Sequence, residues 1–127
     1  MLPQTVWQEF AHKLMLAEAM SCGMTGGGNP VARLASRPEA IRELTLYKRK
    51  VRALVDLGFG FESCNRDDSL KTAFALQEQH GLLTNDAVVL AVALRLRADA
   101  LVSNDKAFRG LEKPDVYFPS DLRRGVP

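Results

Sequence analysis

The sequence contains little cysteine and no long apolar segment. Its two cysteines, Cys22 and Cys64, show neither CxxC spacing nor the density of a disulfide-rich scaffold, so we expect free thiols in a reducing compartment. No apolar run reaches the roughly 18 residues that a membrane span needs. No signal peptide precedes the first predicted helix. These absences predict a cytoplasmic protein without a membrane partner.

Length and composition predict one globular domain over residues 1–127. With 46% hydrophobic and 25% charged residues, the chain can bury a core and shows no sign of disorder. The net charge of +2 and the pI near 8.7 are mildly basic. This charge permits nucleic-acid binding without demonstrating it.

The segment from 81 to 108, GLLTNDAVVLAVALRLRADALVSNDKAF, organises the chain. Residues 87–96 are apolar almost all the way round, which predicts a buried helix that Thr84 can cap, with Asp86 in its first turn. Residues 100–103 predict a buried strand, and Asp105 lies in the polar turn that follows. In a parallel sheet, strand ends and the first turns of helices share one edge. Asp86 and Asp105 can therefore meet there.

The N-terminal half predicts helices around a glycine-rich loop. Residues 3–22 predict an amphipathic helix with Val6, Phe10, Leu14 and Ala17 in one stripe and Glu9 on its border. Residues 24–30 lack the Gly-Lys-Ser/Thr ending of a phosphate loop and predict a flexible connector.

A second helix is predicted to start at a capping box, Ser36 to Glu39, and to end at Gly58. It carries Lys48, Arg49, Lys50 and Arg52. A solvated face explains these cations, and a phosphate-contacting patch is the alternative.

The remaining segments predict an α/β fold. Residues 57–64 predict a strand, one of Asp67, Asp68 or Ser69 is expected to cap the helix that ends at His80 and Gly81, and residues 115–118 predict an edge strand. The order of elements, without internal repeats, is an α/β pattern.

The motifs TNDA and SND-x-x-F, within LLTNDAVVLAVAL and ALVSNDKAF, resemble the C-terminal half of a PIN domain. This metal-dependent nuclease fold occurs in VapC-type toxins of toxin–antitoxin pairs, and the resemblance extends more weakly from Glu9 to Tyr117. It implies a three-layer fold with a parallel sheet. A PIN domain normally opens with a central strand bearing an Asp, which this sequence lacks, so we expect an N-terminally truncated form.

The resemblance also implies site residues. Glu9, which occupies the place of an early family acid in VWQEF, joins Asp86 and Asp105 as catalytic residues and ligands of Mg²⁺ or Mn²⁺. Asp99 is assigned a turn role instead. Further residues are expected to contact substrate: Ser103 and Asn104 near the acids, and Lys48, Arg49 and Arg52 in the basic helix.

The implied activity is hydrolysis of RNA by a metal-dependent endoribonuclease, which we expect the truncation to impair, and the implied protein partner is an antitoxin. The alternatives are a catalytically silent PIN-like remnant that acts as a binding or assembly module, and an unrelated α/β binding protein. Loss of a central strand would expose backbone groups and apolar side chains. We therefore expect a homodimer that uses the N-terminal helix and the strand edge beside residues 100–103.

Overall fold

The computed structural model describes residues 1–119. The chain divides into two compact units, Met1–Glu62 and Ser63–Pro127, and each is described separately below. The prediction of one domain over residues 1–127 stays a prediction. In the described residues no helix combines the length and the apolar composition that a membrane crossing requires.

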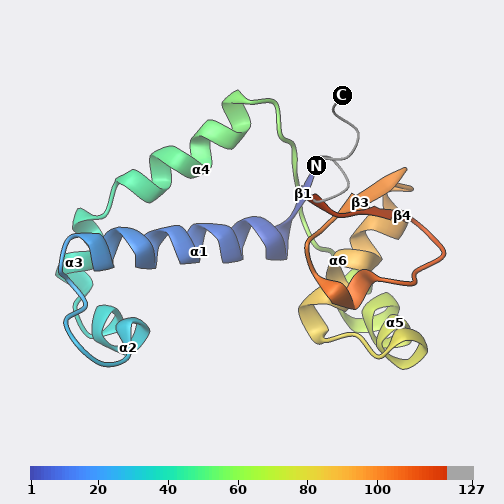
Figure 1. Cartoon of the computed structure of the whole chain (residues 1–127), viewed down its shortest axis with the longest axis horizontal. Helices are drawn as coiled ribbons and strands as arrows, with labels where there is room; N and C mark the ends of the chain where they lie inside the picture. Colours follow the sequence, from blue (N-terminus) through green and yellow to red (C-terminus); the bar gives the residue numbers. More distant parts are fainter. Residues whose placement is uncertain (120–127) are drawn as a thin grey trace. The chain divides into compact units, whose positions relative to one another are not determined.

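The first unit is mainly helical, with one short parallel strand pair (Figure 1). Its core is formed by Ala19, Leu34, Ala40 and Leu44. Trp7 stacks on Phe61, with 5.5 Å between the ring centroids. The elements are β1 (Leu2–Pro3), α1 (Gln4–Ser21), α2 (Pro30–Ala35), α3 (Pro38–Glu43), α4 (Leu46–Asp56) and β2 (Phe61–Glu62), and β1 pairs with β2.

Helix α1 has the predicted extent but buries a different face. Val6 and Phe10 of the predicted stripe are 37% and 39% exposed. The fully buried residue is Ala19, and Met15 and Leu16 pack against the same core. The C-terminal half of α1 is covered because α2, α3 and α4 pack there, and sequence periodicity alone does not reveal which turns of a helix receive neighbours.

The helix predicted after Ser36 is two helices, α3 and α4. The Glu18 carboxylate of α1 accepts hydrogen bonds from the backbone amides of Thr45 (2.9 Å), Leu46 (3.0 Å) and Tyr47 (2.8 Å). This side chain satisfies amides at the start of α4, which Thr45 itself leaves uncapped. The chain therefore breaks where a distant carboxylate replaces the helical hydrogen bonds.

The predicted capping box at Ser36 is also wrong. Residues 30–35 form the additional helix α2, and Ser36 is its C-terminal cap residue. The Ser36 hydroxyl donates to the carbonyl of Arg33 at 2.7 Å, and α3 begins after Arg37 without a side-chain cap. The cap of α2 is Asn29, whose Oδ1 accepts from the amides of Val31 and Ala32.

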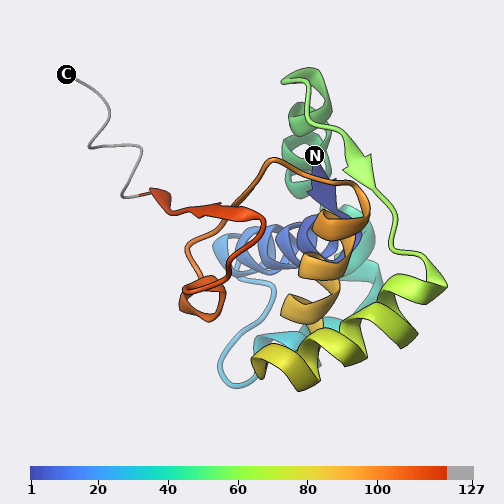
Figure 2. The same ribbon diagram turned by 90° about the vertical axis from the view of Figure 1, so that its right-hand side faces the viewer.

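The second unit packs a helical hairpin against a short parallel strand pair (Figures 1 and 2). Its elements are η1 (Asp68–Thr72, a π-helical turn), α5 (Ala73–His80), α6 (Thr84–Arg95), β3 (Ala100–Val102), η2 (Lys106–Phe108) and β4 (Asp115–Tyr117). The core centres on α6, and α5 and η1 pack on it.

Helix α6 confirms the prediction of a buried helix, since every residue from 87 to 93 is buried. Gly81 ends α5 in the left-handed conformation at φ 68°, as predicted. The prediction that Thr84 caps this helix is wrong. The cap residue of α6 is Leu83, and the hydroxyl of Thr84 lies 3.5 Å from Nε2 of Gln77.

Strands β3 and β4 pair in parallel, with Ala100 opposite Asp115 and Val102 opposite Tyr117. This arrangement confirms the α/β class with parallel strands. The strand predicted for residues 57–64 is limited to Phe61–Glu62. Among residues 1–119, the strands form two separate two-stranded sheets, β1 with β2 and β3 with β4.

Candidate metal site and RNA-binding residues

Asp86 lies in the first turn of α6, as predicted, and its side chain is partly exposed. The backbone is helical there because the amide of Ala87 donates to the carbonyl of Leu83 at 2.9 Å and the buried run begins at Ala87. A carboxylate at this position is favoured by the partial positive charge of the helix start. Asp86 thus stands at the boundary between core and solvent.

Asp105 is exposed and follows the end of β3. Its Oδ1 atom accepts a hydrogen bond from the amide of Ala107 at 2.9 Å, so the side chain caps the short helix η2. Its own amide donates to the hydroxyl of Ser103 at 3.0 Å, and the amide of Ser103 donates to the carbonyl of Tyr117. These bonds connect the turn to both strands. Asn104 is exposed beside them.

Glu9 lies in the first unit, on an exposed surface of α1. Its Oε1 atom is 2.9 Å from Nζ of Lys13, one helical turn later. Both side chains are more than half exposed, so this ion pair contributes little stability. The contacts of Glu9 in the described structure are therefore explained by an exposed ion pair within one helix.

The three basic candidates of α4 are exposed. Lys48 lies over the ring of Tyr47, with 5.8 Å from Nζ to the ring centroid. Arg49 acts electrostatically on Glu18, the carboxylate that caps α4. Arg49 is therefore partly engaged within the protein, and the assignment of Lys48, Arg49 and Arg52 as substrate contacts stays a prediction.

Burial raises the pKa of Glu18, but hydrogen bonds from the amides of Tyr47, Leu46 and Thr45, together with the charge of Arg49, outweigh it. The pKa of this carboxyl is therefore lower than its ordinary value.

Within either unit, the described residues contain no group of three or more His, Cys, Asp or Glu side chains that could hold a metal ion. The donor chemistry of Glu9, Asp86 and Asp105 suits Mg²⁺ or Mn²⁺, because carboxylate oxygens are hard ligands. The predicted three-acid site draws Glu9 from one unit and both aspartates from the other, and its assembly stays a prediction.

Asp99, to which the sequence assigns a turn role, is exposed between α6 and β3. It lines a cavity of about 440 Å³ together with Arg97, Lys113 and Asp115. The cavity lies at the starts of β3 and β4, whereas Asp105 follows the end of β3. Asp99 therefore lies at the opposite end of this strand from Asp105.

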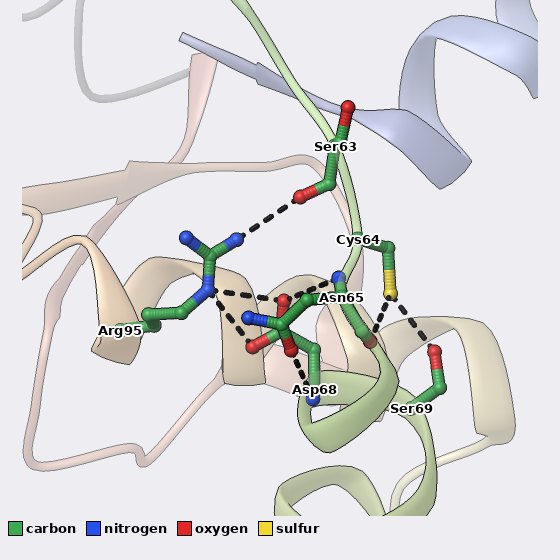
Figure 3. A network of polar contacts seen from close by, with 6 residues as sticks. All are labelled: Ser63, Cys64, Asn65, Asp68, Ser69 and Arg95. Atoms are coloured by element: carbon green, nitrogen blue, oxygen red, sulfur yellow. Dashed lines mark hydrogen bonds and ion pairs between the residues drawn. The ribbon is translucent and has the colours of Figure 1, made fainter.

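A buried ion pair that the sequence did not reveal holds the start of the second unit (Figure 3). Asp68 is 3% exposed, and both of its carboxylate oxygens accept from Nε of Arg95, at 3.0 and 3.1 Å. Nη2 of Arg95 also donates to the carbonyl of Ser63 at 3.0 Å. The sequence predicts a helix cap at one of Asp67, Asp68 or Ser69, whereas the carboxylate of Asp68 ties residues 63–68 to the last turn of α6.

The helix cap in this segment is Asn65. Its Oδ1 accepts from the amide of Asp68 at 2.8 Å, and Oδ2 of Asp68 accepts from the amide of Asn65 at 3.0 Å. Nearby, Cys64 Sγ lies 2.9 Å from the hydroxyl of Ser69. The spacing Asn65-x-x-Asp68 is the one signal in the sequence that indicates such a reciprocal cap.

The second unit places Asp86 in the first turn of α6 and Asp105 in the turn after the parallel strand β3. The PIN domain family model matches residues 1–114, so the chain belongs to the PIN domain family. PIN domains are generally nucleases that depend on divalent metal ions and bind RNA. No curated protein and no solved structure matched the chain.

Proposed function

We propose that this protein is a metal-dependent endoribonuclease. The observation that carries the proposal is the family match over residues 1–114, which includes an acid in the first turn of α6 and another in the turn after β3. In this proposal Glu9, Asp86 and Asp105 hold Mg²⁺ or Mn²⁺. Ser103, Asn104, Lys48, Arg49 and Arg52 contact the RNA.

The chemistry requires such acids because hydrolysis of a phosphodiester must neutralise the phosphate and supply hydroxide near neutral pH. A bound Mg²⁺ or Mn²⁺ ion provides both. Residues of this chain orient the acid and its turn. The hydrogen bond from the amide of Ala107 fixes the carboxylate of Asp105, and the hydrogen bond from the amide of Asp105 to the hydroxyl of Ser103 fixes the turn. Asp86 lies in the first turn of α6, where the partial positive charge of the helix start suits a carboxylate.

The experiment measures Mn²⁺ binding by calorimetry and cleavage of a labelled single-stranded RNA by gel. Asp86→Asn removes charge while keeping volume, so we expect it to abolish both signals. Asp99→Asn is the matched control. It removes the same charge, but from a residue that precedes the start of β3, at the opposite end of the strand from Asp105. Circular dichroism checks that each variant folds. Equal Mn²⁺ affinity in the wild type and in Asp86→Asn would exclude the site.

The alternative is a catalytically silent PIN-like module. It is supported by the structural role of one of the acids, because Asp105 caps η2. Measured RNA binding without metal-dependent cleavage would favour this alternative. The reduced activity expected from the sequence stays a prediction, and the cleavage rate tests it.

Association with an antitoxin or with a second copy is also part of the proposal. For self-association, α1 offers the exposed apolar side chains Val6 and Phe10. Strand β3 offers an edge, since the described strands place only β4 beside it, and Val102 is 62% exposed. A second copy could cover these groups.

A further inference from the structure

The glycine-rich loop after α1 and the start of α3 enclose a second basic site in the first unit. A cavity of about 200 Å³ is lined by residues 23–26 and by Arg33, Ser36 and Arg37. We call it the arginine pocket. Its residues precede Lys48, Arg49 and Arg52, the basic residues of α4, in the sequence.

The wall of the pocket is held in place by hydrogen bonds. The amide of Gly23 donates to the carbonyl of Met20 at 3.1 Å, and the amide of Met24 donates to that of Ala19 at 2.9 Å, which is a Schellman ending of α1. Nη1 of Arg37 donates to the carbonyl of Met24 at 2.8 Å. The pocket is therefore a formed structure, although it lies in a segment whose composition predicts a flexible connector.

The charge of the pocket is not balanced. Nε of Arg37 lies 3.5 Å from Oε1 of Glu39 in an exposed pair. Within residues 1–119, no carboxylate pairs with Arg33, and its guanidinium lies along the loop. A Cβ atom at Gly26 would be 3.1 Å from Nη1 of Arg33, and one at Gly28 would be 3.4 Å from Nε. The absence of side chains at these glycines lets the cation approach the backbone.

A buried threonine lines the same cavity. Thr25 is only 6% exposed, and its hydroxyl is a hydrogen-bond donor that a ligand oxygen in the pocket can use. Two guanidinium groups beside this donor form a site for an anion with several oxygens.

We propose that the arginine pocket binds one backbone phosphate of single-stranded RNA. Guanidinium groups match the geometry of phosphate oxygens, and such contacts add affinity that is independent of base sequence. The choice of RNA rests on the proposed function. Free phosphate has the same chemistry and is distinguished by the experiment.

The experiment measures the anisotropy of a labelled single-stranded RNA in EDTA with the full chain, over a range of salt concentrations. Arg33→Gln should weaken binding by about threefold to tenfold. It should also make the slope of log K against log salt shallower by about 0.7, the value for one phosphate of a single strand. Arg33→Lys keeps the charge and should retain the wild-type slope.

Arg42→Gln is the matched control, because Arg42 is exposed in the last turn of α3, carries the same charge and does not line the pocket. Equal effects of Arg33→Gln and Arg42→Gln would overturn the proposal, as would failure of the wild type to bind RNA. Chemical shifts of the Gly26 and Gly28 amides that respond to inorganic phosphate but not to RNA would assign the pocket to a small anion and also overturn it.

Because the measurement is made in EDTA, its outcome is independent of the metal-dependent reaction. Loss of cleavage and Mn²⁺ binding with a normal Arg33 effect would refute the proposed nuclease alone. Normal cleavage with no Arg33 effect would refute the arginine pocket alone.

Discussion

Substitution of Asp68 by asparagine tests whether the buried pair with Arg95 stabilises the second unit. The side chain of Asp68 is 4% exposed and that of Arg95 is 33% exposed. Asparagine keeps the volume and can still accept from the amide of Asn65, but it removes the charge that balances Arg95. The hydrogen bond from Arg95 to the carbonyl of Ser63 would remain.

Breaking a fully buried pair by removing one partner costs about 3 to 5 kcal/mol. Because a third of the Arg95 side chain reaches solvent, water recovers part of this cost, and we expect a loss of about 2 to 4 kcal/mol. This is a large share of the roughly 5 to 15 kcal/mol that stabilise a typical domain. With a urea slope of about 2 kcal/mol/M, the urea midpoint of unfolding should fall by roughly 1 to 2 M.

The assay is urea unfolding of the full chain followed by circular dichroism. Asp67→Asn is the matched control, since the neighbouring Asp67 is exposed and makes no side-chain cap hydrogen bond. Its expected effect lies within about 0.5 kcal/mol. If Asp68→Asn and Asp67→Asn unfold at the same urea concentration, the pair does not stabilise the unit and this reasoning is refuted.

Three other substitutions and measurements test separate features. Arg97 has φ 50° after α6, so Arg97→Gly should relieve backbone strain and raise the free energy of unfolding by about 1 kcal/mol, and a lower melting temperature would contradict this. The lowered pKa of Glu18 means that its stabilisation is present above the unfolded pKa and is lost as pH falls through the folded pKa. The wild type should therefore be more stable than Glu18→Gln at pH 7, with the difference shrinking in acid, and a difference independent of pH in urea titrations would disprove this origin. Sedimentation at micromolar concentration should show a homodimer that Phe10→Glu weakens, whereas a monomeric wild type would remove the dimer proposal.

The local pattern of the sequence determined the elements whose signals are short in range. The apolar run from 87 to 93 required a helix with neighbours on all sides, and Gly81 required an end to α5 because it adopts the left-handed conformation at little cost. The local pattern also predicts the positions of the two aspartates, with Asp86 at the start of a helix and Asp105 after a strand. The motifs around them also identified the family before any fold was known.

Tertiary contacts decided the features that join distant residues. The break between α3 and α4 depends on Glu18, which lies 27 residues before Thr45, and the pair of Asp68 with Arg95 also spans 27 residues. Neither partner carries a local signal of the other, since a carboxylate on a helix is usually solvated. Hydrogen bonds to backbone amides and the cost of burying a charge select these pairs only after packing brings them together. The arginine pocket arises in the same way, because only the folded loop places Thr25 beside Arg33 and Arg37.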